Sequence, residues 1–187
     1  MTAAKIMIVR HAEKPSDDAT IRGVDAAGND NPEELIVRGW QRSGALARLF
    51  APRDGRFVDP RLATPKTIFA SKVGKHSASL RPQHTVLELA TLLGLQLSLG
   101  HDKSDLKSLA TDAVAAQGPV LIAWEHQDIP DIVNLITGNS TICPQKWPGG
   151  RFDLVWVLDR AGSSDPWSLT QVPQLLLSGD SATPIAM

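Results

Sequence analysis

Short apolar runs alternate with longer segments of helical periodicity along this chain of 187 residues. Three apolar runs are predicted to form buried strands, at residues 5–9, 67–70 and 120–124. The spacing of apolar positions predicts four helices, at residues 33–50, 80–94, 104–116 and 129–137. Alternating strands and helices favour an α/β fold in three layers, with a mostly parallel central sheet and helices on both of its faces.

The C-terminal part of the chain has a different pattern. Residues 152–158 and 168–176 are predicted strands, and the turn at residues 159–166 would join them into a hairpin. Pro173 has no backbone N–H to give to a neighbouring strand, so the second of these strands is expected at an edge of the sheet.

The remaining segments are predicted to be mostly irregular. Residues 16–32 and 72–79 read as polar loops, and we expect them to determine substrate specificity. Alternating leucines allow a short strand at residues 95–99. The tail that begins at Ser178 is expected to be loose.

Chemically active side chains follow all three apolar runs. Because the carboxyl ends of parallel strands lie at one edge of a sheet, these side chains are expected to meet in one crevice. The residues concerned are Arg10 and His11, Ser71 with the later Arg81, and Glu125 with His126. Arginine binds phosphate oxygens with a planar fork, and histidine near neutral pH can be an uncharged nucleophile. The set therefore predicts phosphoryl transfer.

Sequence motifs around these residues support the same chemistry. Arg10-His11-Ala12 is similar to the Arg-His-Gly/Ala signature that ends the first strand of the histidine phosphatase superfamily, the phosphoglycerate-mutase-like proteins. Arg81 and Thr85 keep the register of the family motif Ser-Pro-x-x-Arg-Ala-x-Gln-Thr-Ala, and His126 follows a buried strand as the family's second histidine does. The chain thus resembles the small bacterial-type phosphatases of this superfamily.

The resemblance implies a mechanism and a phosphoglycerate-mutase-like fold. His11 would be the nucleophile that forms a phosphohistidine intermediate, while Arg10, Arg81 and His126 would hold the phosphoryl group. The protein would be a metal-independent phosphatase without a cofactor, acting on a phosphomonoester or a phosphohistidine in a small molecule or a phosphoprotein. The alternatives are phosphoryl transfer of the phosphoglycerate mutase type and a non-catalytic phosphate-binding module.

Several positions depart from the family pattern. In the helix motif Leu-Thr-x-x-Gly-x-x-(Gln/Arg)-Ala, which residues 35–43 resemble, Ile36 replaces the threonine and Ser43 replaces the alanine. Gln127 stands where a glycine usually follows the second histidine, and the gap between Ser71 and Arg81 is longer than usual.

The general acid is the least defined part of the predicted site. Asp128 is our first candidate, with Glu125 and Glu88 as alternatives, and Asp128 could instead cap the helix that follows it. Lys14 and Ser71 are predicted to contact the substrate. Glu13 could do so too, or could form a solvated ion pair with Lys14.

Composition limits the classes of function. A net charge of −1 with dispersed basic residues argues against a nucleic-acid partner, and a single cysteine, Cys143, excludes an internal disulfide. No His/Asp/Glu group has metal-ligand spacing, so no metal site is predicted. The chain has no apolar run of about 18 residues and no secretory leader. We therefore expect one domain over residues 1–187, located in the cytoplasm and away from membranes.

Overall fold

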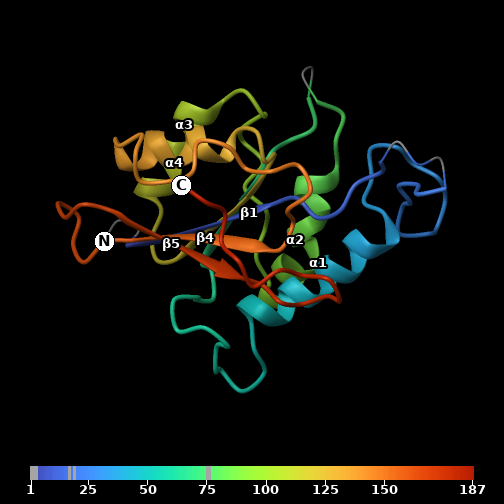
Figure 1. Ribbon diagram of the computed structural model, residues 1–187, viewed down its shortest axis with the longest axis horizontal. Helices are drawn as coiled ribbons and strands as arrows, with labels where there is room; N and C mark the ends of the chain where they lie inside the picture. The colour runs from blue at the N-terminus through green and yellow to red at the C-terminus, as the bar shows by residue number, and fades with distance from the viewer. Residues whose placement is uncertain (1–3, 17, 19, 75–76) are drawn as a thin grey trace.

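A computed structural model of the protein describes residues 4–16, 18, 20–74 and 77–187, and its core is a five-stranded mixed sheet (Figure 1). The strand order is β2-β3-β1-β4-β5. The strands are β1 (Lys5–Arg10), β2 (Thr67–Ala70), β3 (Val120–Trp124), β4 (Leu154–Asp159) and β5 (Ser168–Pro173). The first three match the predicted apolar runs to within one residue.

The sheet is only half parallel, so the prediction of a mostly parallel sheet is wrong. β3 pairs in parallel with both β1 and β2, whereas β4 is antiparallel to both β1 and β5. The reason is the connection that precedes β4. The chain leaves β3 through a helix and then runs through the irregular segment 138–153, which returns it to the edge of the sheet where β1 and β3 end, so that β4 begins there and runs in the opposite direction.

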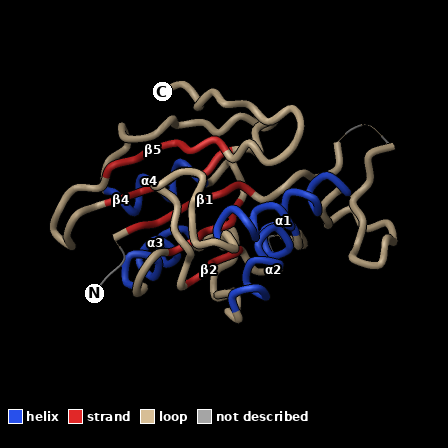
Figure 2. Tube along the Cα trace, turned by 90° about the horizontal axis from the view of Figure 1, so that it is seen from below, coloured by secondary structure: helices blue, strands red, loops and turns tan. Residues whose placement is uncertain are grey.

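Helices cover both faces of the sheet, as predicted, and make three layers (Figure 2). The side chains of β1 alternate between the faces: Ile6 and Ile8 pack in one core, and Met7 and Val9 pack in the other. The first core includes α3 (Leu106–Ala115) and α4 (Ile129–Thr137), and the second includes α1 (Val37–Phe50) and α2 (Arg81–Leu93). Within the described residues, no helix is both long and apolar enough to cross a membrane.

Two helices begin later than the sequence predicts. The helix expected at residues 33–50 begins at Val37, because the extended Ile36 donates its backbone N–H to the carbonyl of Glu13. The helix expected from Ser104 begins at Leu106, because the Ser104 hydroxyl is hydrogen-bonded to Asp102 and does not cap the helix. The segment at residues 95–99 is not a strand either, since it makes only one isolated bridge to β2.

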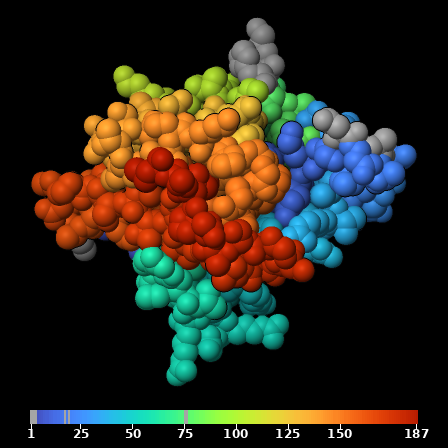
Figure 3. All heavy atoms as spheres, in the orientation of Figure 1, coloured from blue at the N-terminus to red at the C-terminus, as the bar shows by residue number. Residues whose placement is uncertain are grey.

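The C-terminal hairpin forms as predicted, with β5 at the edge of the sheet, but the tail after it is not loose. Ile185 is only 8% exposed and packs into the core on the α3/α4 face. Its backbone N–H and carbonyl both bond to the side chain of Gln171 on β5. Figure 3 shows the last residues packed against the body of the molecule. A short tail with one buried apolar anchor is held by these contacts.

A glycine allows α1 to lie close to the turn that follows β1. A Cβ atom at Gly39 would be 2.5 Å from the carbonyl oxygen of Glu13 and 3.1 Å from its backbone nitrogen. Both atoms belong to the backbone and cannot move independently of the turn. Gly39 is thus required for the packing of α1 against the segment that carries His11.

We expect Gly39→Ala to destabilise the protein by about 1–3 kcal/mol, through the forced separation of α1 from the Glu13 turn. Gly44→Ala is the matched control, because this glycine lies in the same helix, is exposed and has no atom within 4 Å of its would-be Cβ. Gly44→Ala should stabilise the protein by up to about 1 kcal/mol, because alanine has a higher helix propensity than glycine. Urea denaturation measures both, and equal effects of the two substitutions would contradict the packing role of Gly39.

Candidate active site

The candidate site lies at the carboxyl ends of β1 and β3, which are parallel neighbours. Arg10 is opposite Trp124 in the register, and the backbone N–H of His11 donates to the Trp124 carbonyl at 2.9 Å. The strand ends therefore hold Arg10 and His11 next to Glu125 and His126, as expected for a site at the carboxyl edge of parallel strands.

Arg10 is buried, and its guanidinium is only partly satisfied. Nη1 donates to the carbonyls of Gly149 and Arg151, at 2.5 and 3.0 Å, and the ring of Phe152 lies 3.7 Å from the guanidinium carbon. Nε and Nη2 are buried without a hydrogen-bond partner in the described part of the chain. Buried donors of a charged group are normally paired. The two free groups therefore indicate a place where an anion would bind.

His11 is held in the form that a nucleophile requires. Its ring is 4% exposed, and Nδ1 lies 2.8 Å from the carbonyl oxygen of Ala12. A carbonyl can only accept, so Nδ1 carries the proton and Nε2 of the neutral ring keeps a lone pair. Burial lowers the pKa of His11 to about 3, and the positive charges of Arg10, Arg81 and His126 add to this effect against the Ala12 hydrogen bond. His11 is thus uncharged at neutral pH.

Arg81 approaches His11 from α2. Its positive charge acts on His11, but three of its five N–H groups are already used by Glu34 O, Ser79 Oγ and Pro32 O. One hydrogen on each terminal nitrogen is not used by these three bonds, and the Glu33 carboxylate lies 3.8 Å from Nη2. The segment 32–34 therefore fixes the direction of Arg81 without using up its donors.

His126 closes the other side of the site. A Cβ atom at Gly149 would lie 3.7 Å from Nε2 of His126, so the imidazole lies against the same loop that holds Arg10. Burial lowers the pKa of His126 to about 4, and the charges of Arg10 and Lys14 lower it further. The structure thus brings together the four residues that the sequence predicted, Arg10, His11, Arg81 and His126.

The other predicted site residues differ in their positions. Lys14 is exposed, and its positive charge lowers the pKa of His126. Ser71 is buried at the end of β2, where its carbonyl accepts from the Gln83 side chain at 3.1 Å. Asp128 is the residue before α4 but makes no capping hydrogen bond with its side chain. Burial and the charge of Glu125 raise the pKa of Asp128, while Lys103 lowers it.

Thr85 links the segment that follows β1 to α2. Its hydroxyl accepts from the backbone N–H of Ala12 at 2.7 Å and donates to the carbonyl of Arg81, also at 2.7 Å. Ala12 thus has both backbone groups engaged, since its carbonyl also accepts from the His11 ring. The threonine that keeps the family register couples the position of His11 to the start of the Arg81 helix.

Sequence reasoning missed the loop that holds Arg10. No role was predicted from the sequence for the segment before β4, yet Gly149, Arg151 and Phe152 provide the two carbonyls and the ring around the guanidinium. The Gly149-Gly150 pair was the available signal, because consecutive glycines allow a close approach of backbone to a neighbouring group.

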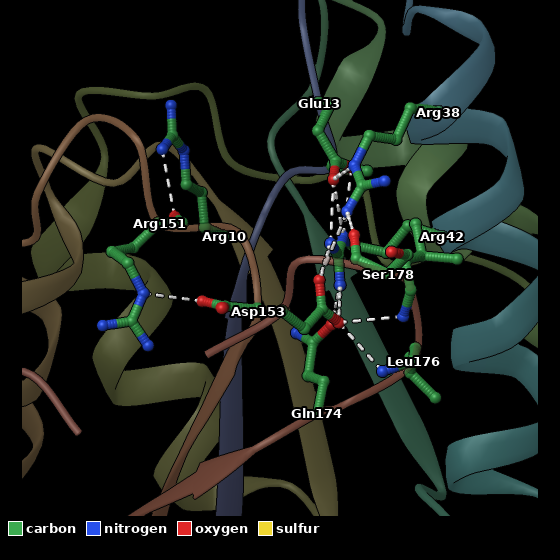
Figure 4. A network of polar contacts seen from close by, with 12 residues as sticks. Arg10, Glu13, Arg38, Arg42, Arg151, Asp153, Gln174, Leu176 and Ser178 are labelled. Atoms are coloured by element: carbon green, nitrogen blue, oxygen red, sulfur yellow. Dashed lines mark hydrogen bonds and ion pairs between the residues drawn. The ribbon is translucent and has the colours of Figure 1, made fainter. Parts of the chain in front are cut away.

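Glu13 does not form a solvated ion pair, and its charge acts on Arg10. It is buried and accepts from Arg42 at 2.8 Å and from Arg38 at 3.1 Å. The Arg42 guanidinium is also paired with Asp180 of the C-terminal segment, at 2.7 Å, and with the Gln174 side chain (Figure 4). Arg42 therefore connects the turn after His11 to the end of the chain.

Comparison with known proteins identifies the fold. No family model and no curated protein matches the sequence. Solved structures do match: a mycobacterial glucosyl-3-phosphoglycerate phosphatase in complex with VO3 has a TM-score of 0.56 at 13% identity, over 89% of this chain and 97% of that one. The protein histidine phosphatase SixA in complex with tungstate has a TM-score of 0.52 at 16% identity, over 91% and 97%.

A SixA protein from Agrobacterium tumefaciens is similar to the same degree, with a TM-score of 0.50 at 17% identity over 89% of this chain and 96% of that one. The chain thus has a phosphoglycerate-mutase-like α/β fold, shared with histidine phosphatases along about 90% of its length. The resemblance predicted from the sequence is confirmed at the level of the fold.

The burial of neutral His11 predicts a loss of stability in acid. Below its ordinary pKa of about 6.5, the unfolded chain binds a proton at His11 that the folded protein does not bind until the pH falls to about 3. Stability should therefore decrease as the pH falls from 7, and this residue alone should account for about 2 kcal/mol at pH 5. His11→Asn, which has no titrating group, should show a pH dependence weaker by that amount.

Urea denaturation of both proteins at pH 7 and pH 5, in buffers free of phosphate, measures this difference. An identical pH dependence of the two proteins would show that His11 is not buried as a neutral ring.

The Arg42 network predicts a large cost for removing one buried carboxylate. Asp180→Asn would leave Arg42 with one anionic partner and should destabilise the protein by about 3 kcal/mol. The control is Asp159→Asn, which removes the more exposed ion pair with Lys5 and should cost at most about 1 kcal/mol. Thermal unfolding compares the two variants, and a small effect of Asp180→Asn would contradict the role of the tail in holding the Glu13 turn.

Proposed function

We propose that this protein is a phosphatase that acts through a phosphohistidine on His11. The observation that carries the proposal is the pairing of two features at one place: a neutral imidazole with a free Nε2, and a buried guanidinium with two unpaired donors. An anionic, tetrahedral phosphoryl group satisfies both, because it supplies acceptors for Arg10 and an electrophile for His11.

The reaction then takes two steps. In the first, Nε2 of His11 forms a bond to phosphorus while the bond from phosphorus to the leaving group breaks, and the leaving group takes up a proton. In the second, water attacks the phosphohistidine, the P–N bond breaks, and His11 is neutral again as phosphate leaves. Charge on the phosphoryl oxygens would be stabilised by Arg10, by the two remaining donors of Arg81 and by His126.

The comparisons support an oxyanion as ligand. Two of the similar structures hold VO3 or tungstate, oxyanions of the kind that resembles a phosphoryl group. The phosphatases among them act on a phosphorylated small molecule or, by name, on protein histidine. The substrate of this protein is accordingly a phosphomonoester or a phosphohistidine, presented by a small molecule or a phosphoprotein.

The test is the nucleophile variant. With radiolabelled p-nitrophenyl phosphate as substrate, the wild-type protein denatured at alkaline pH should carry a phosphoryl label that later acid treatment removes, and His11→Ala should carry none. Turnover by His11→Ala should fall at least about 10³-fold. His101→Ala is the control, because this histidine lies in a loop, where its ring is paired with Asp112 at 3.0 Å.

Full phosphatase activity of His11→Ala would refute the mechanism. Tight binding of phosphate or vanadate by a wild-type protein that hydrolyses no ester or phosphoramidate would instead identify a non-catalytic binding module. Interconversion of phosphoglycerate isomers without release of phosphate would identify a mutase.

A further inference from the structure

Glu125 lies beside the nucleophile, one strand away. The register pairs Arg10 with Trp124, and the hydrogen bond from His11 N to Trp124 O continues the ladder by one residue. The next positions on the two strands are therefore His11 and Glu125. Adjacent strands are about 4.8 Å apart, so a carboxylate at Glu125 is within reach of a group bound to His11.

The two side chains also belong to the same face of the sheet. Ile8 and Trp124 pack in the core under α3 and α4, whereas Val9 and Ala123 pack in the core under α1 and α2. Side chains alternate along a strand, so His11 and Glu125 both follow the second pattern and face the helices that carry Arg81. The negative charge of Glu125 does act on Arg81, whose own charge acts on His11.

The Glu125 carboxylate is available for chemistry. It is half-buried, and no hydrogen bond or ion pair to its side chain is present among the described residues. This differs from Glu13 and Glu34, which are buried and paired with Arg42 and His84. A carboxylate without a structural partner beside an anion site needs an explanation, because its charge would repel a bound phosphoryl group.

Asp128, the candidate that the sequence favoured, has different surroundings. The charged groups that act on it are Glu125, Lys103 and Asp131, and none of the four anion-site residues is among them. It lies at the start of α4, one residue beyond the exposed Gln127. Of the groups that act on it, Lys103 belongs to the segment that precedes α3 and Asp131 belongs to α4.

We propose that Glu125 is the general acid of the phosphatase, and that the substrate is therefore a phosphomonoester of an aliphatic alcohol. This inference rests on the proposed function. The Glu125 carboxylate takes up a proton when the anionic substrate binds beside it. As Nε2 of His11 bonds to phosphorus and the P–O bond breaks, the carboxyl group gives this proton to the departing oxygen and becomes a carboxylate again. In the second step the carboxylate takes a proton from the attacking water and loses it as phosphate leaves, which returns both groups to their starting forms.

The choice of substrate class follows from the leaving group. An alkoxide is about as basic as hydroxide, whose conjugate acid has a pKa of about 15.7, so it leaves well only when it is protonated. An imidazole that leaves from a phosphohistidine is a far weaker base and has no need of a carboxylic acid. A carboxyl group placed beside the nucleophile is useful for the ester of an alcohol.

The experiment compares two substrates, glycerol 1-phosphate and p-nitrophenyl phosphate, through kcat/KM, which reports only the steps up to the first P–O cleavage. Glu125→Gln should lower kcat/KM for the alkyl ester by about 10²–10⁴-fold. It should change kcat/KM for the nitrophenyl ester by less than about 5-fold, because nitrophenolate leaves without a proton. Asp131→Asn, an exposed carboxylate of α4, is the control and should change neither value.

Three results would overturn the assignment. Equal losses on both esters in Glu125→Gln would show that Glu125 only holds Arg81, and unchanged values on both would show that it has no part in the first step. A selective loss on the alkyl ester in Asp128→Asn instead would assign the acid to Asp128. Each of these leaves the phosphatase itself intact, whereas a wild-type protein that hydrolyses neither ester and is not labelled on His11 contradicts the proposed function as well.

Discussion

The buried guanidinium of Arg42 holds together the segments that surround the site. It has carboxylates from two distant parts of the chain, Glu13 just after the nucleophile and Asp180 near the C-terminus, at 2.8 and 2.7 Å. Burial alone would lower the pKa of Arg42. The hydrogen bonds and the two negative charges outweigh burial and raise this pKa above its usual range. The turn that carries His11 is thereby fixed to α1 on one side and to the tail on the other.

Because the sheet is mixed, residues that follow two strands and residues that precede a third strand meet at one edge and form the site. The parallel ends of β1 and β3 deliver Arg10 and His11 beside Glu125 and His126. The antiparallel β4 brings the residues before it, Gly149 to Phe152, to the same edge, where they hold the Arg10 side chain. A fully parallel sheet would have the start of β4 at the far edge, and the guanidinium would then lack these carbonyls.

Apolar patterning was enough to predict most helices and strands, and the ends of the predicted strands pointed to residues that the structure places near one another. The runs at 67–70 and 120–124 became strands with the predicted bounds, because buried parallel strands are apolar along their whole length. Arg10 and His11 were recognisable because a polar pair directly follows such a strand.

What the sequence could not show depends on long-range contacts. The direction of β4 is set by the path of the irregular segment 138–153, which has no periodicity to interpret. The tail looked loose because its anchors, Asp180 and Ile185, are single residues whose partners are far away in the sequence. Likewise, Glu125 differs from any solvated glutamate only through the strand register that places it beside His11.

The backbone of Ala12 limits how the site around His11 can change in evolution. Its carbonyl fixes the proton on the imidazole, and its N–H is tied to α2 through Thr85. A displacement of α2 would therefore rotate the imidazole ring of His11, so the position of this ring and the position of α2 can change only together. New substrates must then be accommodated by remodelling the surrounding loops, and relatives that have diverged in selectivity should keep the backbone around this alanine superimposable.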